Sequence, residues 1–113
     1  MNEYLLVFRR DYKTKNIQPT TTNMQEHLTR WQVFFSNIKE KIAKPIQRFD
    51  PSGKIVTKDK SVADGPYADG IQSIGGLVII NAANYNEAVA IAQTCPILEL
   101  GGTIEIRQRV SSY

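Results

Sequence analysis

Gly75-Gly76-Leu77-Val78-Ile79-Ile80 is the most apolar stretch of the chain, and it follows the turn sequence Asp64-Gly65-Pro66-Tyr67. Four consecutive aliphatic residues after a glycine pair are typical of a strand that is buried on both faces. Asp-Gly-Pro predicts a rigid turn, because aspartate bonds its own backbone, glycine permits positive φ and proline restricts φ to about −65°. We therefore expect a buried strand that is preceded by a turn carrying a carboxylate.

The other elements can be placed outward from that strand. Residues 4–8 form a second run that is apolar on both alternating faces. Apolar residues spaced by three and four from Met24 to Ile42 predict one amphipathic helix, which Pro45 stops. The expected elements, in order, are a strand at 4–8, a helix at 24–42, a hairpin of 45–49 with 54–57, a strand at 75–82, a helix at 87–94 and a strand at 103–107.

This order predicts a single α+β domain over residues 1–113, of the split β-α-β type, with an antiparallel sheet and two helices on one face. Two helices cover only one face of the sheet, yet two of its strands are apolar on both faces. A second copy of the chain is the simplest cover for the other face, so we expect a homodimer.

Composition excludes several classes of function. The net charge is +3, but the basic residues are spread from Arg9 to Arg109 with acidic residues between them, so nucleic-acid binding is not expected. No apolar run approaches the roughly 18 residues of a membrane helix, and the N-terminus has no signal-peptide pattern. One cysteine allows no internal disulfide, which favours a reducing cytoplasm.

Four motifs occur in a fixed order: Asp64-Gly65-Pro66-Tyr67, Gly75-Gly76 before the apolar strand, Cys95-Pro96, and Gly101-Gly102 before residues 103–107. Over nearly the whole chain, this set resembles the YCII-related proteins, and within them the DGPF branch. The resemblance implies a ferredoxin-like fold of the dimeric α/β barrel type, with two sheets face to face. It also implies relatives that include dehalogenases acting on chloromuconolactones, and a histidine–aspartate pair proposed for the broader family.

The sequence departs from the DGPF pattern at three places. Tyr67 replaces the usual phenylalanine, and Gly70-Ile71 stands where many members have a charged pair. Residues 44–49 lack the glycine-rich stretch that is common there. These departures bear on a shared substrate more than on the fold.

His27 and Asp64 are the expected catalytic residues. His27 is the only histidine and falls where the resembling family has one on its long helix; imidazole is the natural acid or base near neutral pH. Asp64 lies on a stiff turn, and its contact with His27 would raise the pKa of the imidazole above about 6.5. The alternatives are a boundary histidine bonded to backbone and an aspartate that only bonds its own turn.

Tyr67 and Arg107 are the expected substrate-binding residues. Tyr67 is placed to donate a hydrogen bond at a pocket mouth, or else it packs behind the turn. Arg107 shares one side of the last strand with Glu105, and in the implied fold that side faces the dimer cavity, where a guanidinium suits an anionic substrate. A salt bridge across strands or between subunits is the alternative.

No metal and no cofactor are expected. Cys95 lies in apolar sequence at a helix end, where a thiolate is disfavoured, so we interpret it as a small buried hydrophobe. One histidine and one cysteine far apart in sequence do not make a metal site. The glycine pairs lack the context of a phosphate loop and are interpreted as turns that lead into strands.

Two classes of function remain. The first is a small cofactor-free enzyme, of the lyase, isomerase or dehalogenase type, that uses His27 and Asp64 on a small anionic organic compound. The second is a non-catalytic module for small-molecule sensing or protein interaction, which the occurrence of some DGPF members beside extracytoplasmic-function sigma factors implies. The enzyme requires both residues within reach of one pocket, whereas the module does not.

Overall fold

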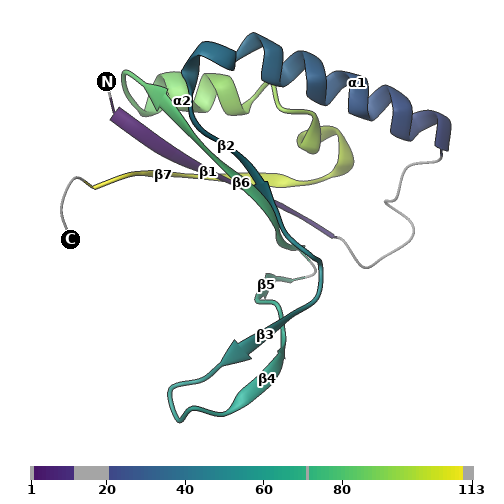
Figure 1. Ribbon diagram of the computed structural model, residues 1–113, viewed down its shortest axis with the longest axis vertical. Helices are drawn as coiled ribbons and strands as arrows, with labels where there is room; N and C mark the ends of the chain where they lie inside the picture. Colours follow the sequence, from purple (N-terminus) through teal and green to yellow (C-terminus); the bar gives the residue numbers. More distant parts are fainter. Residues whose placement is uncertain (1, 12–20, 71, 111–113) are drawn as a thin grey trace.

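The computed structural model describes residues 2–11, 21–70 and 72–110, which form a layer of helices on a layer of sheet (Figure 1). The strands of the main sheet are β1 (Asn2–Arg10), β2 (Ile42–Arg48), β5 (Ala68–Asp69), β6 (Gln72–Ala82) and β7 (Thr103–Gln108). The helices are α1 (Thr21–Asn37) and α2 (Tyr85–Ala92), with the 3-10 turns η2 (Lys39–Lys41) and η3 (Pro96–Leu100). Within the described ranges, no helix is both long and apolar enough to cross a membrane.

The strand order of the main sheet is β2-β6-β1-β7, with the short β5 beside β6. All of these pairings are antiparallel. This is the strand order of a ferredoxin-like fold, and Figure 1 shows α1 and α2 on the same side of the sheet. The expected α+β fold, an antiparallel sheet with two helices on one face, is confirmed.

The core lies between the helices and the sheet. Alternate residues of β1 and β6 face the helices, as the period of two in a strand requires. Leu6 and Val78 are partners in the β1–β6 register, and neither has any exposed surface. Phe34 and Ile38, at the end of α1 and just after it, complete this layer. The second helix begins with a capped turn, because the side-chain oxygen of Asn84 accepts a hydrogen bond from the Glu87 amide at 2.9 Å.

The first helix is shorter than predicted. It ends at Asn37, and Ile42, which was assigned to its last turn, begins β2 and pairs with Ile80. Ile42 keeps an inward position in either structure, so its spacing could not distinguish helix from strand. Pro45 does not stop the helix. It lies inside β2, where a missing amide is tolerated because β2 is an edge strand with an irregular register.

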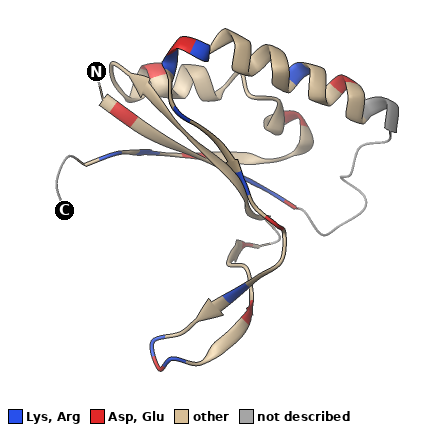
Figure 2. Ribbon diagram, viewed as in Figure 1, with Lys and Arg blue, Asp and Glu red and all other residues tan. Residues whose placement is uncertain are grey.

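The predicted hairpin pairs the wrong segments. Residues 45–49 do not pair with residues 54–57, because β2 joins the main sheet instead. The second segment forms β3 (Gly53–Val56), which pairs with β4 (Val62–Gly65) in a sequence expected to be a loop. We call residues 53–65 the arm. It projects from the main sheet on the side away from the helices (Figure 1), and it carries charges of both signs (Figure 2).

The sheet face opposite the helices is apolar at its centre. Leu5 and Val7 of β1 pair with Ile79 and Leu77 of β6, and all four side chains turn away from the helices. These side chains are buried or half-buried even though no helix of the described chain covers this face. We call this surface the open sheet face. Its apolar character confirms the prediction that β1 and β6 carry apolar side chains on both faces of the sheet.

Gly102 has no room for a side chain. A Cβ there would lie 2.7 Å from the Arg9 carbonyl oxygen and 2.7 Å from Ile97 Cγ1. We therefore expect Gly102→Ala to lower the free energy of unfolding by about 1–3 kcal/mol, the usual cost of overpacking. Urea unfolding followed by circular dichroism measures this difference.

Gly53→Ala is the matched control, because its Cβ would come no closer than 3.4 Å to Pro66. The control should change the free energy of unfolding by less than about 0.5 kcal/mol. If Gly102→Ala and Gly53→Ala unfolded at the same urea concentration, that result would contradict the clash at Gly102.

Candidate functional site

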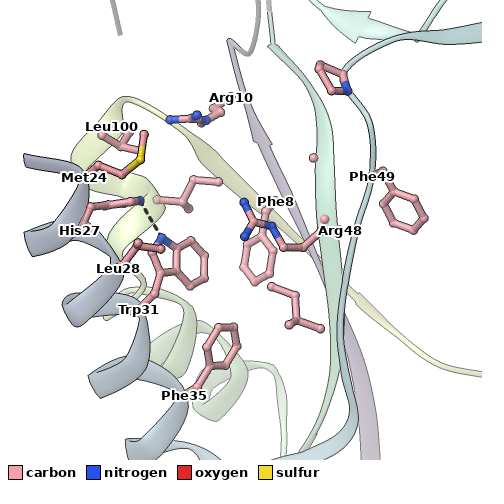
Figure 3. Close-up of a pocket in the computed structure, with 15 residues that line it drawn as sticks. Phe8, Arg10, Met24, His27, Leu28, Trp31, Phe35, Arg48, Phe49 and Leu100 are labelled. Atoms are coloured by element: carbon pink, nitrogen blue, oxygen red, sulfur yellow. Dashed lines mark hydrogen bonds between the residues drawn. The ribbon is translucent and has the colours of Figure 1, made fainter. Parts of the chain in front are cut away.

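A cavity of about 390 Å³ lies between α1 and the sheet, beside the end of β1 and the start of β6. Its apolar walls include the rings of Phe8, Trp31 and Phe35. The polar side chains that line it are Arg10, His27 and Arg48. Figure 3 shows His27 and Trp31 projecting from the helix toward Phe8 and Arg48 on the strands. The cavity therefore combines flat apolar walls with cationic and titratable groups.

Helix geometry brings the wall of this cavity together. Met24, Leu28, Trp31 and Phe35 follow one another at intervals of four, three and four residues, so they share one face of α1. His27 lies on the edge of the same face, one turn before Trp31. The apolar stripe that predicted the helix thus also forms the wall of the cavity.

Gly75 and Gly76 line the opposite side of the cavity. They lie within β6, so the interpretation of this pair as a turn before the strand is wrong. A Cβ on Gly76 would lie 2.9 Å from the Gln47 carbonyl oxygen and 3.7 Å from the Phe8 ring, which explains the glycine there. The second pair fits its prediction, because Gly101 adopts φ 77° at the end of η3, directly before β7.

His27 is held by Trp31. The indole Nε1–H of Trp31 donates a hydrogen bond of 2.7 Å to Nε2 of His27. A neutral imidazole that accepts at Nε2 carries its proton on Nδ1, so this bond assigns the tautomer. Trp31 is itself stacked on Phe35, with ring centroids 5.4 Å apart, and meets the edge of Phe8 at 5.6 Å. The orientation of the imidazole therefore depends on an aromatic cluster.

The pKa of His27 is lowered from its ordinary value of 6.5. Burial is the largest cause, and the guanidinium of Arg10 is the next. Glu99 acts in the opposite direction, but Arg30 and Arg48 add to the lowering. The expected rise in the pKa of His27 required contact with Asp64, and without that contact the shift has the opposite sign. At neutral pH the imidazole is therefore mostly neutral, the form that accepts a proton.

Asp64 and Tyr67 lie outside this cavity within one chain. Asp64 lies within β4, so the prediction that it sits on a turn is wrong. Its carboxylate is paired with Lys54 on the arm, and its side chain is 89% exposed. Tyr67 is 78% exposed, beyond the end of β4. Neither residue is among those that line the cavity. The structure thus does not bring His27 and Asp64 together in a single chain, and their joint role stays a prediction.

Arg107 lies on the open sheet face. Its guanidinium is 3.6 Å from the Glu105 carboxylate, which also accepts a 2.6 Å bond from Arg9. The Arg9–Glu105 contact joins β1 to β7, so the salt-bridge alternative describes this cluster within the chain. These arginines lower the pKa of Glu105, with Arg9 the main cause. Arg107 does not line the cavity that contains His27.

Sequence reasoning missed Trp31, Arg10 and Arg48 as site residues. Trp31 was assigned to the helix stripe alone, although its spacing of four residues from the only histidine was a usable signal. Arg10 and Arg48 are the last residues of β1 and β2, two neighbours of β6. Since β2 was given a different partner, nothing in the sequence placed these two strand ends together.

The interpretation of Cys95 is confirmed. The residue is buried, and burial raises the pKa of its thiol to about 12. Within the described part of the chain, no three His, Cys, Asp or Glu side chains come close enough together to hold a metal ion.

We expect Cys95 to resist thiol reagents in the folded protein. At pH 8, a thiol with a pKa of about 12 has roughly 1,000-fold less thiolate than one at its usual value. Reaction with an aromatic disulfide reagent, followed by absorbance, should therefore be negligible in buffer and complete in concentrated urea. Full labelling of the native protein within minutes would contradict this burial.

Comparison with known proteins supports the fold. The sequence profile of the YCII-related domain matches residues 5–110. A search of curated proteins gives no match. A similar solved structure is 5-chloro-2-hydroxyhydroquinone dehydrochlorinase from Burkholderia phenoliruptrix AC1100, in complex with 2,5-dihydroxybenzoquinone. It has 14% sequence identity and a TM-score of 0.52, with 96% of this chain and 95% of that chain covered.

At that identity the likeness to the dehydrochlorinase shows a shared fold and nothing more. The profile match is independent of it and spans β1 to the end of β7. This chain therefore belongs to the YCII-related family.

Proposed function

We propose that this protein binds a small, flat, anionic organic compound in the cavity beside Trp31 and acts on it as a cofactor-free enzyme of the lyase, isomerase or dehalogenase type. The observation that carries the proposal is a neutral histidine in an aromatic-walled cavity that two arginines also line. A volume of about 390 Å³ is within the range of small-molecule sites. In this proposal the chain is a member of the DGPF branch.

The walls and the charges suit different parts of such a ligand. The rings of Phe8, Trp31 and Phe35 offer flat apolar surface to an aromatic or quinonoid ring. Arg10 and Arg48 present planar donors, which match carboxylate and phenolate oxygens better than a lysine would. The cavity thus favours a ring that carries one or two anionic oxygens.

His27 is the proposed base. Its Nε2 lone pair is occupied by the Trp31 indole in the empty cavity, so a ligand must replace that hydrogen bond. The indole N–H is then available to donate to the ligand. In a dehydrochlorination, Nε2 would take a proton from the ring compound, a new double bond would form, and the C–Cl electron pair would leave with chloride. Every atom balances without an added oxidant or cofactor.

The comparison supports this choice of ligand. The similar dehydrochlorinase is named for a chlorinated hydroxyhydroquinone and was solved with 2,5-dihydroxybenzoquinone, a flat ring with two acidic hydroxyl groups. Asp64 is the proposed partner of His27, while Tyr67 and Arg107 are proposed ligand contacts. In one chain all three lie outside the cavity, so their participation would require a second chain.

We further propose that the protein is a homodimer that pairs its open sheet faces. Leu5, Val7, Leu77 and Ile79 form the apolar centre of each face, which suits the self-complementary contact of a two-fold dimer. Sedimentation equilibrium at micromolar concentration should give twice the chain mass of 12.7 kDa. A single species at the chain mass would contradict this assembly.

Ligand binding can be followed directly, because Trp31 is the only tryptophan and lines the cavity. We expect 2,5-dihydroxybenzoquinone to quench its fluorescence saturably, after correction for the ligand's absorbance. Arg48→Met should weaken binding about tenfold or more, since it removes a cation from the cavity. Arg109→Met is the matched control, because Arg109 pairs with Glu3 and does not line the cavity, and it should bind within about twofold of the wild type. Equal losses in both variants would contradict this cavity as the binding site.

Catalysis is tested separately from binding. With a chlorinated hydroxyhydroquinone as the substrate, His27→Gln should abolish chloride release while keeping ligand binding within a few-fold, because glutamine retains a hydrogen-bonding side chain but cannot act as a base near neutral pH. A chloride-selective electrode measures turnover. Chloride release by the variant at the wild-type rate would exclude His27 as the base.

A non-catalytic sensing or interaction module is the second candidate. The observation that favours it is that Nε2 of His27 already accepts the Trp31 hydrogen bond, which leaves the basic nitrogen engaged. Such a module would bind the same ring compounds with the same dependence on Arg48 and would release no chloride from any of them. The paired binding and turnover measurements therefore separate the two candidates.

A further inference from the structure

The arm has an apolar surface that nothing in the described chain covers. Lys54 pairs with Asp64 across the two strands, and Val56 pairs with Val62. These two pairs lie on the same face of the arm, because side chains on one face repeat every second residue. Val56 is 69% exposed and Val62 is 67% exposed. An isolated two-stranded hairpin is marginally stable in water, so this face indicates a surface that packs against another body.

The arm and the open sheet face lie on the same side of the molecule. Figure 1 shows both helices on one side of the sheet and the arm extending from the other. A body that covers the open sheet face would therefore approach the molecule from the side on which the arm extends. A second copy presents the same apolar face, so it fits this position without any further partner.

We propose that the arm clasps a second copy of this chain and carries Asp64 to the cavity of that copy, so that each His27 meets the partner's Asp64. The site would then be complete only in the dimer. The proposal concerns the cavity of the proposed function, but it requires no particular ligand or reaction.

Charge complementarity supports this placement. The cavity has two arginines and a histidine in its lining, and none of its described lining residues is a carboxylate. Asp64 has the complementary charge and is held only at the surface of the arm by its pair with Lys54. Exposed ion pairs of this kind contribute little to stability. Breaking the Asp64–Lys54 pair, so that Asp64 can meet the cavity of the second copy, therefore costs little free energy.

The apolar surface beside the cavity and the Nδ1–H donor of His27 also fit this placement of the arm. Met24, Leu28 and Phe49 line the cavity and remain exposed, which gives the Val56–Val62 pair an apolar surface to meet. Since Nε2 of His27 accepts from Trp31, the neutral ring has its proton on Nδ1. A carboxylate is the natural acceptor for that Nδ1–H, as in other histidine–carboxylate pairs.

The single histidine makes the proposal measurable. In one chain, His27 is faced by Arg10 of β1, Arg30 of α1, Arg48 of β2 and Glu99 of η3. A carboxylate from the partner would oppose the arginines and raise the pKa of the imidazole. Nuclear magnetic resonance titration of the one imidazole reads this effect without a ligand.

The decisive experiment mixes two variants. Isotope-labelled Asp64→Asn chain is refolded with an excess of unlabelled His27→Gln chain, so that labelled His27 can meet Asp64 only from the other chain. We expect its pKa to rise by about one unit relative to the Asp64→Asn protein alone, and to match the wild type. An excess of unlabelled chain that carries both substitutions is the control and should give no rise. Asp59→Asn, at the tip of the same arm, should leave the titration unchanged.

A second measurement tests the arm without any titration. Val62→Lys should raise the dimer dissociation constant about tenfold or more, because it places a charge in the proposed contact. Val33→Lys, at an exposed position of α1 outside the cavity, is the matched control and should leave the dissociation constant unchanged.

Each unfavourable result has a definite meaning. A wild-type imidazole that titrates like that of Asp64→Asn overturns the proposal, and so does a mixed sample that titrates like Asp64→Asn alone. A dimer that Val62→Lys does not weaken overturns the arm contact while leaving the pairing of open sheet faces intact. Failure of 2,5-dihydroxybenzoquinone to bind would overturn the proposed function and leave these titrations unaffected.

Discussion

The antiparallel pairing of β1 with β6 is the interaction on which the rest of the structure depends. It runs from Asn2 opposite Ala82 to Arg10 opposite Ser73, with a bulge after Phe8. The pairing buries Leu6 against Val78 toward the helices and places Val7 beside Leu77 on the other side. It therefore creates the core and the open sheet face at the same time. A one-residue slip would exchange the two faces, which is why the register is strongly specified.

The same pairing forms the cavity at its far end. Phe8 lies opposite Gly76, and the missing side chain lets β2 pass close by, with its Gln47 carbonyl oxygen 2.9 Å from where a Cβ would lie. α1 then lays Trp31 edge-on to the Phe8 ring, and Trp31 holds His27. The position of the imidazole is thus the end of a chain of packing contacts that begins in the central strands. The lowered pKa of His27 follows from burial in that packing together with Arg10 at the end of β1.

The open sheet face and the arm are the parts of the chain that a single copy does not complete. Figure 1 shows the helices as one layer on one side of the sheet, with no helix of the described chain on the other side. The chain therefore has a core on one side of its sheet only. The exposed valines of the arm and the outward-facing apolar side chains of β1 and β6 are both apolar surfaces that a second copy would cover.

The sequence by itself determined the types of most of the main elements, the α+β fold class and the burial of Cys95, because these follow from local periodicity and from the polarity of short segments. It also located His27 on a packed helix face. It could not decide where α1 ends, since Ile42 points inward in either a helix or a strand. Nor could it decide which segment pairs with residues 53–56, since the Asp50 turn was the stronger local signal and the turn that joins β3 to β4 lies at residues 57–61.

The contents of the cavity were decided by tertiary structure alone. Arg10 and Arg48 come together because β1 and β2 lie on either side of β6. Asp64 lies away from His27 because β4 pairs with β3 rather than with the main sheet. Local sequence sets which groups are available, but the distances between them depend on long-range strand pairing, which short-range periodicity does not encode.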